Sequence, residues 1–128
     1  MAGPDELLTR DAIQGCEDAR SERVEVPEWR GAVMVKVMKA ADRRAWETAC
    51  TVRKRGPGGA ITVEPNEKDE RVMLVIHAVV NATGAPMFTA ADEAWLNQKS
   101  SAPIDRIYKK ACELNGLTAK DEDEEKNS

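Results

Sequence analysis

The sequence contains few aromatic residues and no long apolar run. One Phe, one Tyr and three Trp make up 4% of its 128 residues, so aliphatic side chains must supply most of the core. The longest apolar run, residues 72–80, is interrupted by His77 and falls short of the roughly 20 residues that cross a bilayer. The first 20 residues carry acidic side chains and no apolar centre, unlike a secretion signal. We therefore expect no membrane segment and a single domain.

Histidine and cysteine are too sparse to mark a catalytic or metal site. His77 is the only histidine, and Cys16, Cys50 and Cys112 are widely spaced without a Cys-x-x-Cys pair. The short ligand spacings of a structural zinc site are missing, so three reduced thiols are expected. Catalysis by His77 would need a nucleophile and an orienting acid within hydrogen-bond reach, and the sequence marks neither. We expect no enzyme, no metal and no cofactor.

The charge balance is slightly acidic. With 19 Lys and Arg against 23 Asp and Glu, the net charge is −4 and the isoelectric point about 5.1. General nucleic-acid binding needs a basic surface that neutralises phosphates, so it is not expected. Seven basic residues form a group in the sequence: Lys36, Lys39, Arg43, Arg44, Arg53, Lys54 and Arg55. We interpret the group as a solvated helix face and a loop, and a docking site for an acidic partner or a nucleic acid is the alternative. The Gly-Pro-Gly-Gly run at 56–59 lacks the Lys-Ser/Thr of a phosphate-binding loop.

Residues 24–38 carry the clearest structural signal. Valines alternate with other residues on both sides of Pro27 and Gly31. This period of two, with β-branched residues around turn formers, predicts a β-hairpin with one buried face. Trp29 lies at the turn, either as a plug over a helical layer or as an exposed anchor for a partner. The plug is the favoured interpretation.

Two helical patterns flank the hairpin. A short helix over 8–16 is expected to begin at Thr9. Its narrow apolar stripe consists of Ala12, Ile13 and Cys16. A second helix over 39–55 should end at Gly56, where the glycine-rich run begins. Residues 60–63 are extended in pattern and can supply a third strand.

The second half of the chain holds the expected core helix. Asn66 is predicted to cap a helix over 66–80 that is buried on most sides, although its many β-branched residues also allow a long buried strand. After a turn, Thr89 should cap a short helix in which Trp95 and Leu96 face inward.

The last helix has the cleanest amphipathic spacing, at i, i+3, i+4, i+7 and i+10. Its apolar face consists of Ile104, Ile107, Tyr108, Ala111 and Leu114. Asn115 and Gly116 should supply a left-handed cap, with Leu117 folding back on Cys112 or Ala111.

These elements predict an α+β fold. A small N-terminal antiparallel β-hairpin, gaining a third strand if residues 60–63 pair with it, packs on a bundle of about four helices. Residues 1–118 form a single domain. Residues 119–128 form an acidic tail that cannot bury apolar surface and should be disordered.

The order of several short motifs resembles a known family. Leu-Thr-Arg-Asp-Ala-Ile at 8–13, Val-Glu-Val-Pro-Glu-Trp at 24–29, Ala-Thr-Gly-Ala-Pro-Met-Phe-Thr at 82–89 and Leu-Asn-Gly-Leu at 114–117 are similar to segments of the tail assembly chaperones of long, flexible-tailed bacteriophages. The resemblance covers roughly residues 7–118. Two departures are Arg30, where a second glycine is common, and Ala82-Thr83, which replace acidic residues. Residues 53–64 match no part of the family pattern.

The resemblance implies a non-catalytic role in the host bacterial cytoplasm. Such proteins coat the long, hydrophobic, helical tape-measure protein, help recruit tail-tube subunits around it and are absent from the finished virion. Binding of an amphipathic helix and the addition of many weak copies along one ligand both suit this role. Self-association is a further expectation. As the partner-binding surface we predict the hairpin, with the Phe88 turn and the last helix as supports: Val26, Trp29, Val33, Phe88, Tyr108 and Leu117.

The resemblance also implies a longer form of the chain. In this family, a longer form often arises by ribosomal frameshifting near the end of the short reading frame. Glu-Lys-Asn at 125–127 contains a slippery heptamer if its codons are GAA AAA AAC, and an ordinary charged end is the alternative.

Two other classes remain open. Another small phage structural protein, such as a tail-completion or head–tail joining factor, would stay in the particle. A nucleic-acid-binding regulator would use the basic helix at 39–55 and show salt-dependent affinity.

Overall fold

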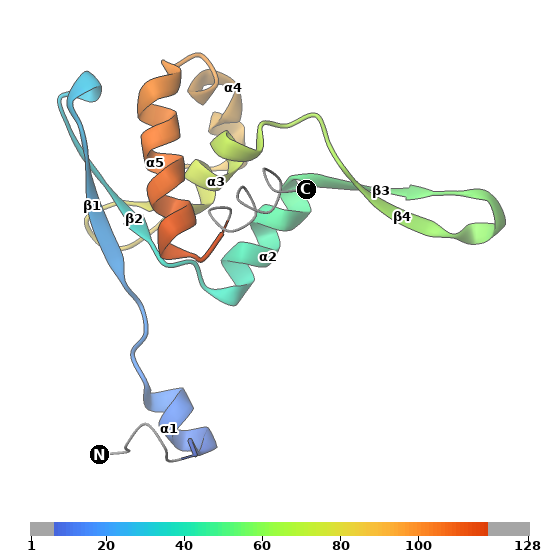
Figure 1. The fold of residues 1–128 in the computed structure, drawn as a ribbon, viewed down its shortest axis with the longest axis horizontal. Coiled ribbons are helices and arrows are strands. Elements are labelled where there is room, and N and C mark those ends of the chain that lie inside the picture. The colour runs from blue at the N-terminus through green and yellow to red at the C-terminus, as the bar shows by residue number, and fades with distance from the viewer. Residues whose placement is uncertain (1–6, 118–128) are drawn as a thin grey trace, which may run out of the picture.

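A computed structural model describes residues 7–117, and the predicted tail at 119–128 lies outside them. The fold is α+β, as expected. A three-stranded antiparallel sheet has the order β1 (Ser21–Val26), β2 (Gly31–Lys36) and β5 (Val79–Val80). Helices α3 (Glu70–Ala78) and α5 (Ser101–Leu114) pack beside this sheet to form the body of the molecule (Figure 1).

The predicted hairpin is confirmed as β1 and β2. Val24 pairs with Val33 and Val26 with Gly31, so these residues share the face toward α5. Val26 and Val35 are fully buried there. A 3₁₀ turn, Pro27–Trp29, joins the strands and ends at Arg30, whose φ of 59° lies in the left-handed region. A glycine would adopt this backbone without steric cost.

The predicted helix over 39–55 is too long. Helix α2 (Ala40–Ala49) ends six residues earlier, and β3 (Thr51–Arg55) follows. β3 pairs with β4 (Ile61–Pro65) in a second, two-stranded sheet. The glycine-rich run between them folds into a 3₁₀ turn, Pro57–Gly59, with positive φ at its two glycines. Cross-strand pairing therefore overrides the helical pattern of residues 51–55.

The third strand of the body sheet was assigned to the wrong segment. Residues 61–63 belong to β4, whereas Val79–Val80 joins β2 as β5. The apolar run at 72–80 is thus a helix that ends at Ala78 and continues as a short strand, so each of its two interpretations is right for part of the run.

The cap of α3 also differs from the prediction. Asp69 is the capping residue, and its carboxylate accepts a hydrogen bond from the Arg71 amide at 2.9 Å. Asn66 instead fixes the base of the second hairpin. Its side-chain Nδ2 donates to the Ala49 carbonyl at 2.6 Å, and its backbone N–H donates to the Cys50 carbonyl at 3.0 Å.

Two short helices expose more apolar surface than the sequence predicted. Helix α1 (Arg10–Gly15) is capped by Thr9 as expected, but it has no buried residue, so its apolar stripe does not face the core. Helix α4 (Glu93–Leu96) follows the 3₁₀ turn Ala90–Asp92. It buries Leu96 but leaves Trp95 46% exposed, so the prediction of an inward Trp95 was wrong.

The end of α5 matches its prediction closely. The Leu117 amide donates to the Cys112 carbonyl at 2.8 Å, and Gly116, at a φ of 64°, donates to Glu113 at 3.4 Å. This is the Schellman arrangement. Side-chain contacts also join the two ends of α5 to the hairpin: Arg106 binds Glu28, and Asn115 binds the backbone after β2.

Candidate partner-binding surface

The structure places five of the six predicted contact residues at the edge of the hydrophobic core. Val26 has no exposed surface, so in this conformation it acts only through packing. The other five are half-buried and pack against the core: Trp29, Val33, Phe88, Tyr108 and Leu117. Trp29 thus closes over the core, as the plug interpretation expects, and still keeps part of its ring at the surface.

A charged clamp fixes the hairpin tip on α5. Both terminal guanidinium nitrogens of Arg106 donate to the Glu28 carboxylate, at 2.7 and 2.8 Å. The hydrogen bonds from Arg106 lower the pKa of Glu28 from about 4.5 to about 2. Trp29 follows Glu28 directly, so the clamp fixes the backbone next to Trp29 on α5.

A second apolar site lies around α4 and was only partly predicted. We define the Trp95 cluster as Met87, Phe88 and Trp95. The Phe88 and Trp95 rings meet edge to face, with centroids 5.9 Å apart and planes at 67°. Trp95 and Met87 are 46% and 45% exposed. The cluster therefore presents an aromatic and a flexible thioether side chain to the outside.

Asp92 holds the Trp95 ring in this outward position. One carboxylate oxygen accepts from the Trp95 indole N–H at 2.8 Å, and the other accepts from the Thr89 amide at 2.8 Å. These hydrogen bonds lower the pKa of Asp92, and the bond from the Thr89 amide has the larger effect. Lys99 lies above the ring, with Nζ 6.0 Å from its centroid. The indole N–H is thus paired with Asp92, while Trp95 remains 46% exposed.

Sequence reasoning missed Trp95 although a signal was present. Neighbouring residues on a helix point about 100° apart, so a four-residue helix that packs on one side can bury Leu96 and leave Trp95 at the surface. The Thr-x-x-Asp box was read only as a helix cap, whereas its aspartate also binds the indole.

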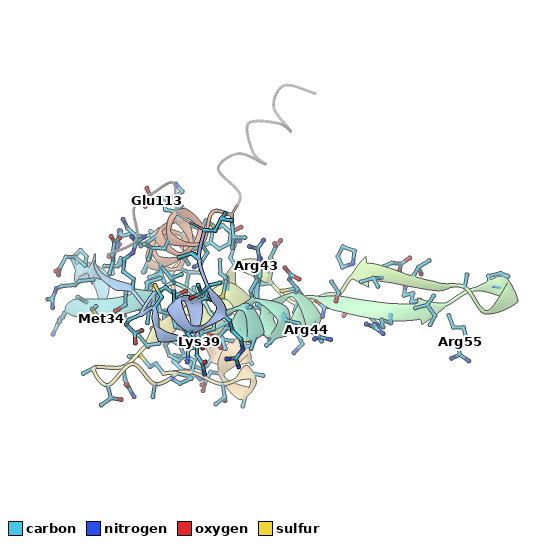
Figure 2. All side chains as sticks on the ribbon, turned by 90° about the horizontal axis from the view of Figure 1, so that it is seen from below. Met34, Lys39, Arg43, Arg44, Arg55 and Glu113 are labelled. Carbon is cyan, nitrogen blue, oxygen red and sulfur yellow. The ribbon has the colours of Figure 1, made fainter. Side chains whose placement is uncertain are left out.

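The predicted basic group is divided among three elements, β2, α2 and β3. Lys36 pairs with Asp42 at 2.8 Å and belongs to the body. Figure 2 shows Arg43 and Arg44 on different sides of α2, and Arg55 far out on β3. The group therefore does not form the single basic helix face that the nucleic-acid interpretation required.

The lone histidine is engaged by its own helix. Nδ1 of His77 lies 2.8 Å from the Met73 carbonyl oxygen, which makes Nδ1 the protonated nitrogen. No helix within residues 7–117 has the length and hydropathy to cross a membrane.

Comparison with known families decides which class the chain represents. A family model described as phage tail assembly chaperone matches residues 9–127. The chain belongs to the phage tail assembly chaperone family. The family that the short motifs suggested is thereby confirmed, and this chaperone acts in phage tail assembly. The matched range includes the hairpin, the Trp95 cluster and residues 53–64. No curated protein and no solved structure matches the chain.

Proposed function

We propose that this chaperone binds the tape-measure protein of its phage and keeps that protein soluble until tail-tube subunits assemble around it. The proposal is supported by the family match and by the apolar surface that the body leaves open. In this role the chaperone works in the host cytoplasm and is absent from the virion. It performs no catalytic step.

The Trp95 cluster is the observation that carries this proposal. An amphipathic helix binds by placing apolar side chains against exposed aromatic and aliphatic groups. Tryptophan dominates many protein interfaces, and methionine adapts to different partner surfaces. Because the indole N–H of Trp95 is already bonded to Asp92, burying the ring under a partner helix does not leave this N–H unpaired.

The hairpin surface extends the binding area in the same proposal. Trp29, Val33, Tyr108 and Leu117 keep part of their surface exposed around α5. Each of these contacts is small. Many copies bound along one long partner gain affinity through multivalency.

A binding experiment with matched variants tests the proposal. Trp95→Ala removes the largest exposed side chain of the cluster, and we expect at least about a tenfold weaker capture of the tape-measure protein. Val52→Ala, which alters a 40% exposed residue on the second hairpin, is the control and should bind like the wild type. Equal capture by both variants, with both correctly folded, would remove the Trp95 cluster from the proposal.

A longer frameshifted form would add a second activity. We propose that it links the bound tape-measure protein to tail-tube subunits. The predicted slip site at 125–127 lies outside the described residues. Reading GAG or AAG at codons 125 and 126 would exclude this slip site.

A further inference from the structure

The second hairpin is an arm with little support from the body. We define the arm as residues 51–65, which contain β3 and β4. Figure 1 shows it projecting away from the helices. Every residue of β4 is exposed, and so is every residue of β3 except Thr51. Since isolated two-stranded hairpins are only marginally stable in water, such an arm gains much from being covered.

One face of the arm combines apolar and positive side chains. Directly paired residues of antiparallel strands project to the same face. Arg53 pairs with Val63 and Arg55 with Ile61, so these four side chains share a face. Val63 and Ile61 are 61% and 58% exposed. Within residues 7–117, neither arginine takes part in an ion pair.

The opposite face of the arm is different. Lys54 there binds Glu64 at 3.0 Å across the strands, and the two charges neutralise each other. Val52 pairs with Glu64 and lies on this face. The apolar, positive face is therefore distinct, and a partner for it should be apolar and negative.

The N-terminal segment has this complementary character. We define it as residues 7–18, which include α1. Leu7, Leu8 and Ile13 are among the most exposed apolar side chains within the described part of the chain. Leu8 and Ile13 flank the Thr9 cap at the positions that lie side by side in a hydrophobic staple. Residues 7–18 carry three acidic side chains and one arginine.

We propose that the N-terminal segment of one copy docks on the arm of a second copy. Leu8 and Ile13 cover Ile61 and Val63, and the acidic side chains of the segment face the two unpaired arginines. Figure 1 shows α1 and the arm leaving the body in different directions. Two different patches on one chain give a head-to-tail contact, which forms a ring if it closes and a row of copies if it does not.

The other acidic segment of the chain fits the arm less well. Residues 121–125 are all acidic and offer no apolar side chain for Ile61 and Val63. The N-terminal segment satisfies both requirements. The proposal concerns the chain alone and does not rest on tape-measure binding.

Sedimentation of the chain without a partner tests the contact. We expect the mass of the wild type to rise with concentration, and added salt to weaken this rise by screening the charges. The double variant Ile61→Thr/Val63→Thr keeps β-branched residues in the arm and should raise the dissociation constant at least about tenfold. Leu8→Ser/Ile13→Ser should do the same. Val52→Thr, on the opposite face, should associate like the wild type.

Mixing the two double variants separates head-to-tail docking from pairing of identical surfaces. One variant retains the N-terminal segment and the other retains the arm, so the mixture should form a dimer that grows no further. A wild type that stays monomeric at its highest soluble concentration would overturn the proposal. So would an arm variant that associates as strongly as the wild type, or a mixture that forms no dimer.

Discussion

Replacement of Asn115 by alanine should destabilise the fold more than is usual for a half-buried side chain. Its Oδ1 accepts from the Met38 amide at 2.7 Å, and its Nδ2 donates to the carbonyls of Ala111 at 2.9 Å and Lys36 at 3.3 Å. This single amide therefore joins the end of α5 to the chain that leaves β2. Met38 itself is 8% exposed, so little water can replace the lost acceptor.

The expected magnitude follows from these bonds. A net hydrogen bond contributes about 1 kcal/mol, and a buried donor left unpaired costs about 1–3 kcal/mol. Because Asn115 is only half-buried, water can satisfy the two carbonyls, and the free energy of unfolding should fall by about 2–3 kcal/mol. Asn115→Asp keeps the acceptor but turns a carboxylate oxygen toward the two carbonyls, so this isosteric change should cost at least as much.

Urea unfolding followed by tryptophan fluorescence measures the effect, with an unchanged slope confirming that only stability differs. Asn97→Ala is the matched control. Asn97 is exposed, and within residues 7–117 its side chain bonds only to Glu93 one turn away, so its loss should change stability by less than about 0.5 kcal/mol. If Asn115→Ala is as stable as Asn97→Ala, the reasoning about the bridge between α5 and β2 is refuted.

Four further predictions follow from single residues. Ile107→Ala, at a fully buried position of α5, should lower the free energy of unfolding by about 2–5 kcal/mol in the same assay. Arg30→Gly should raise it by up to about 1 kcal/mol, because it relieves a left-handed backbone, and a loss would contradict that. The pKa of Glu28 is lowered to about 2, so the contribution of its ion pair to folding stability is present above about pH 4.5 and is lost as the pH falls toward 2. The difference in stability between the wild type and Glu28→Gln should therefore vanish across that pH range. Burial, and then the nearby carboxylates at the start of α3, raise the pKa of Cys50 to about 11. Alkylation near pH 8 should therefore modify the exposed Cys16 well before Cys50, and mass spectrometry measures the order.

Local patterns predicted those elements whose stabilising contacts lie close in the sequence. The valines of the first hairpin alternate because one face meets α5, and that alternation is visible in the chain itself. The Asn-Gly-Leu end of α5 specified its own cap, since the bonds of a Schellman motif join residues only three to five apart.

The errors occurred where pairing over a longer distance decided the structure. Val52 fits the apolar face of a helix, and only the presence of β4 a few residues later makes it part of a strand. Val79 and Val80 continue the pattern of α3, but β2 offers them a strand edge that the local sequence does not reveal. The environment of Trp95 depends on the hydrogen bond that its indole donates to Asp92 and on which of the neighbours Trp95 and Leu96 is buried in the core.

Co-expression with the tape-measure protein of the same phage tests the central claim most directly. The readout is the fraction of the tape-measure protein that stays soluble with the wild-type chaperone, with Trp95→Ala and with no chaperone. We predict that the wild type moves the tape-measure protein from the pellet into a soluble complex and that Trp95→Ala, at equal soluble level, does so much less. A tape-measure protein that remains insoluble with the wild type, or that is equally soluble without it, would contradict the account.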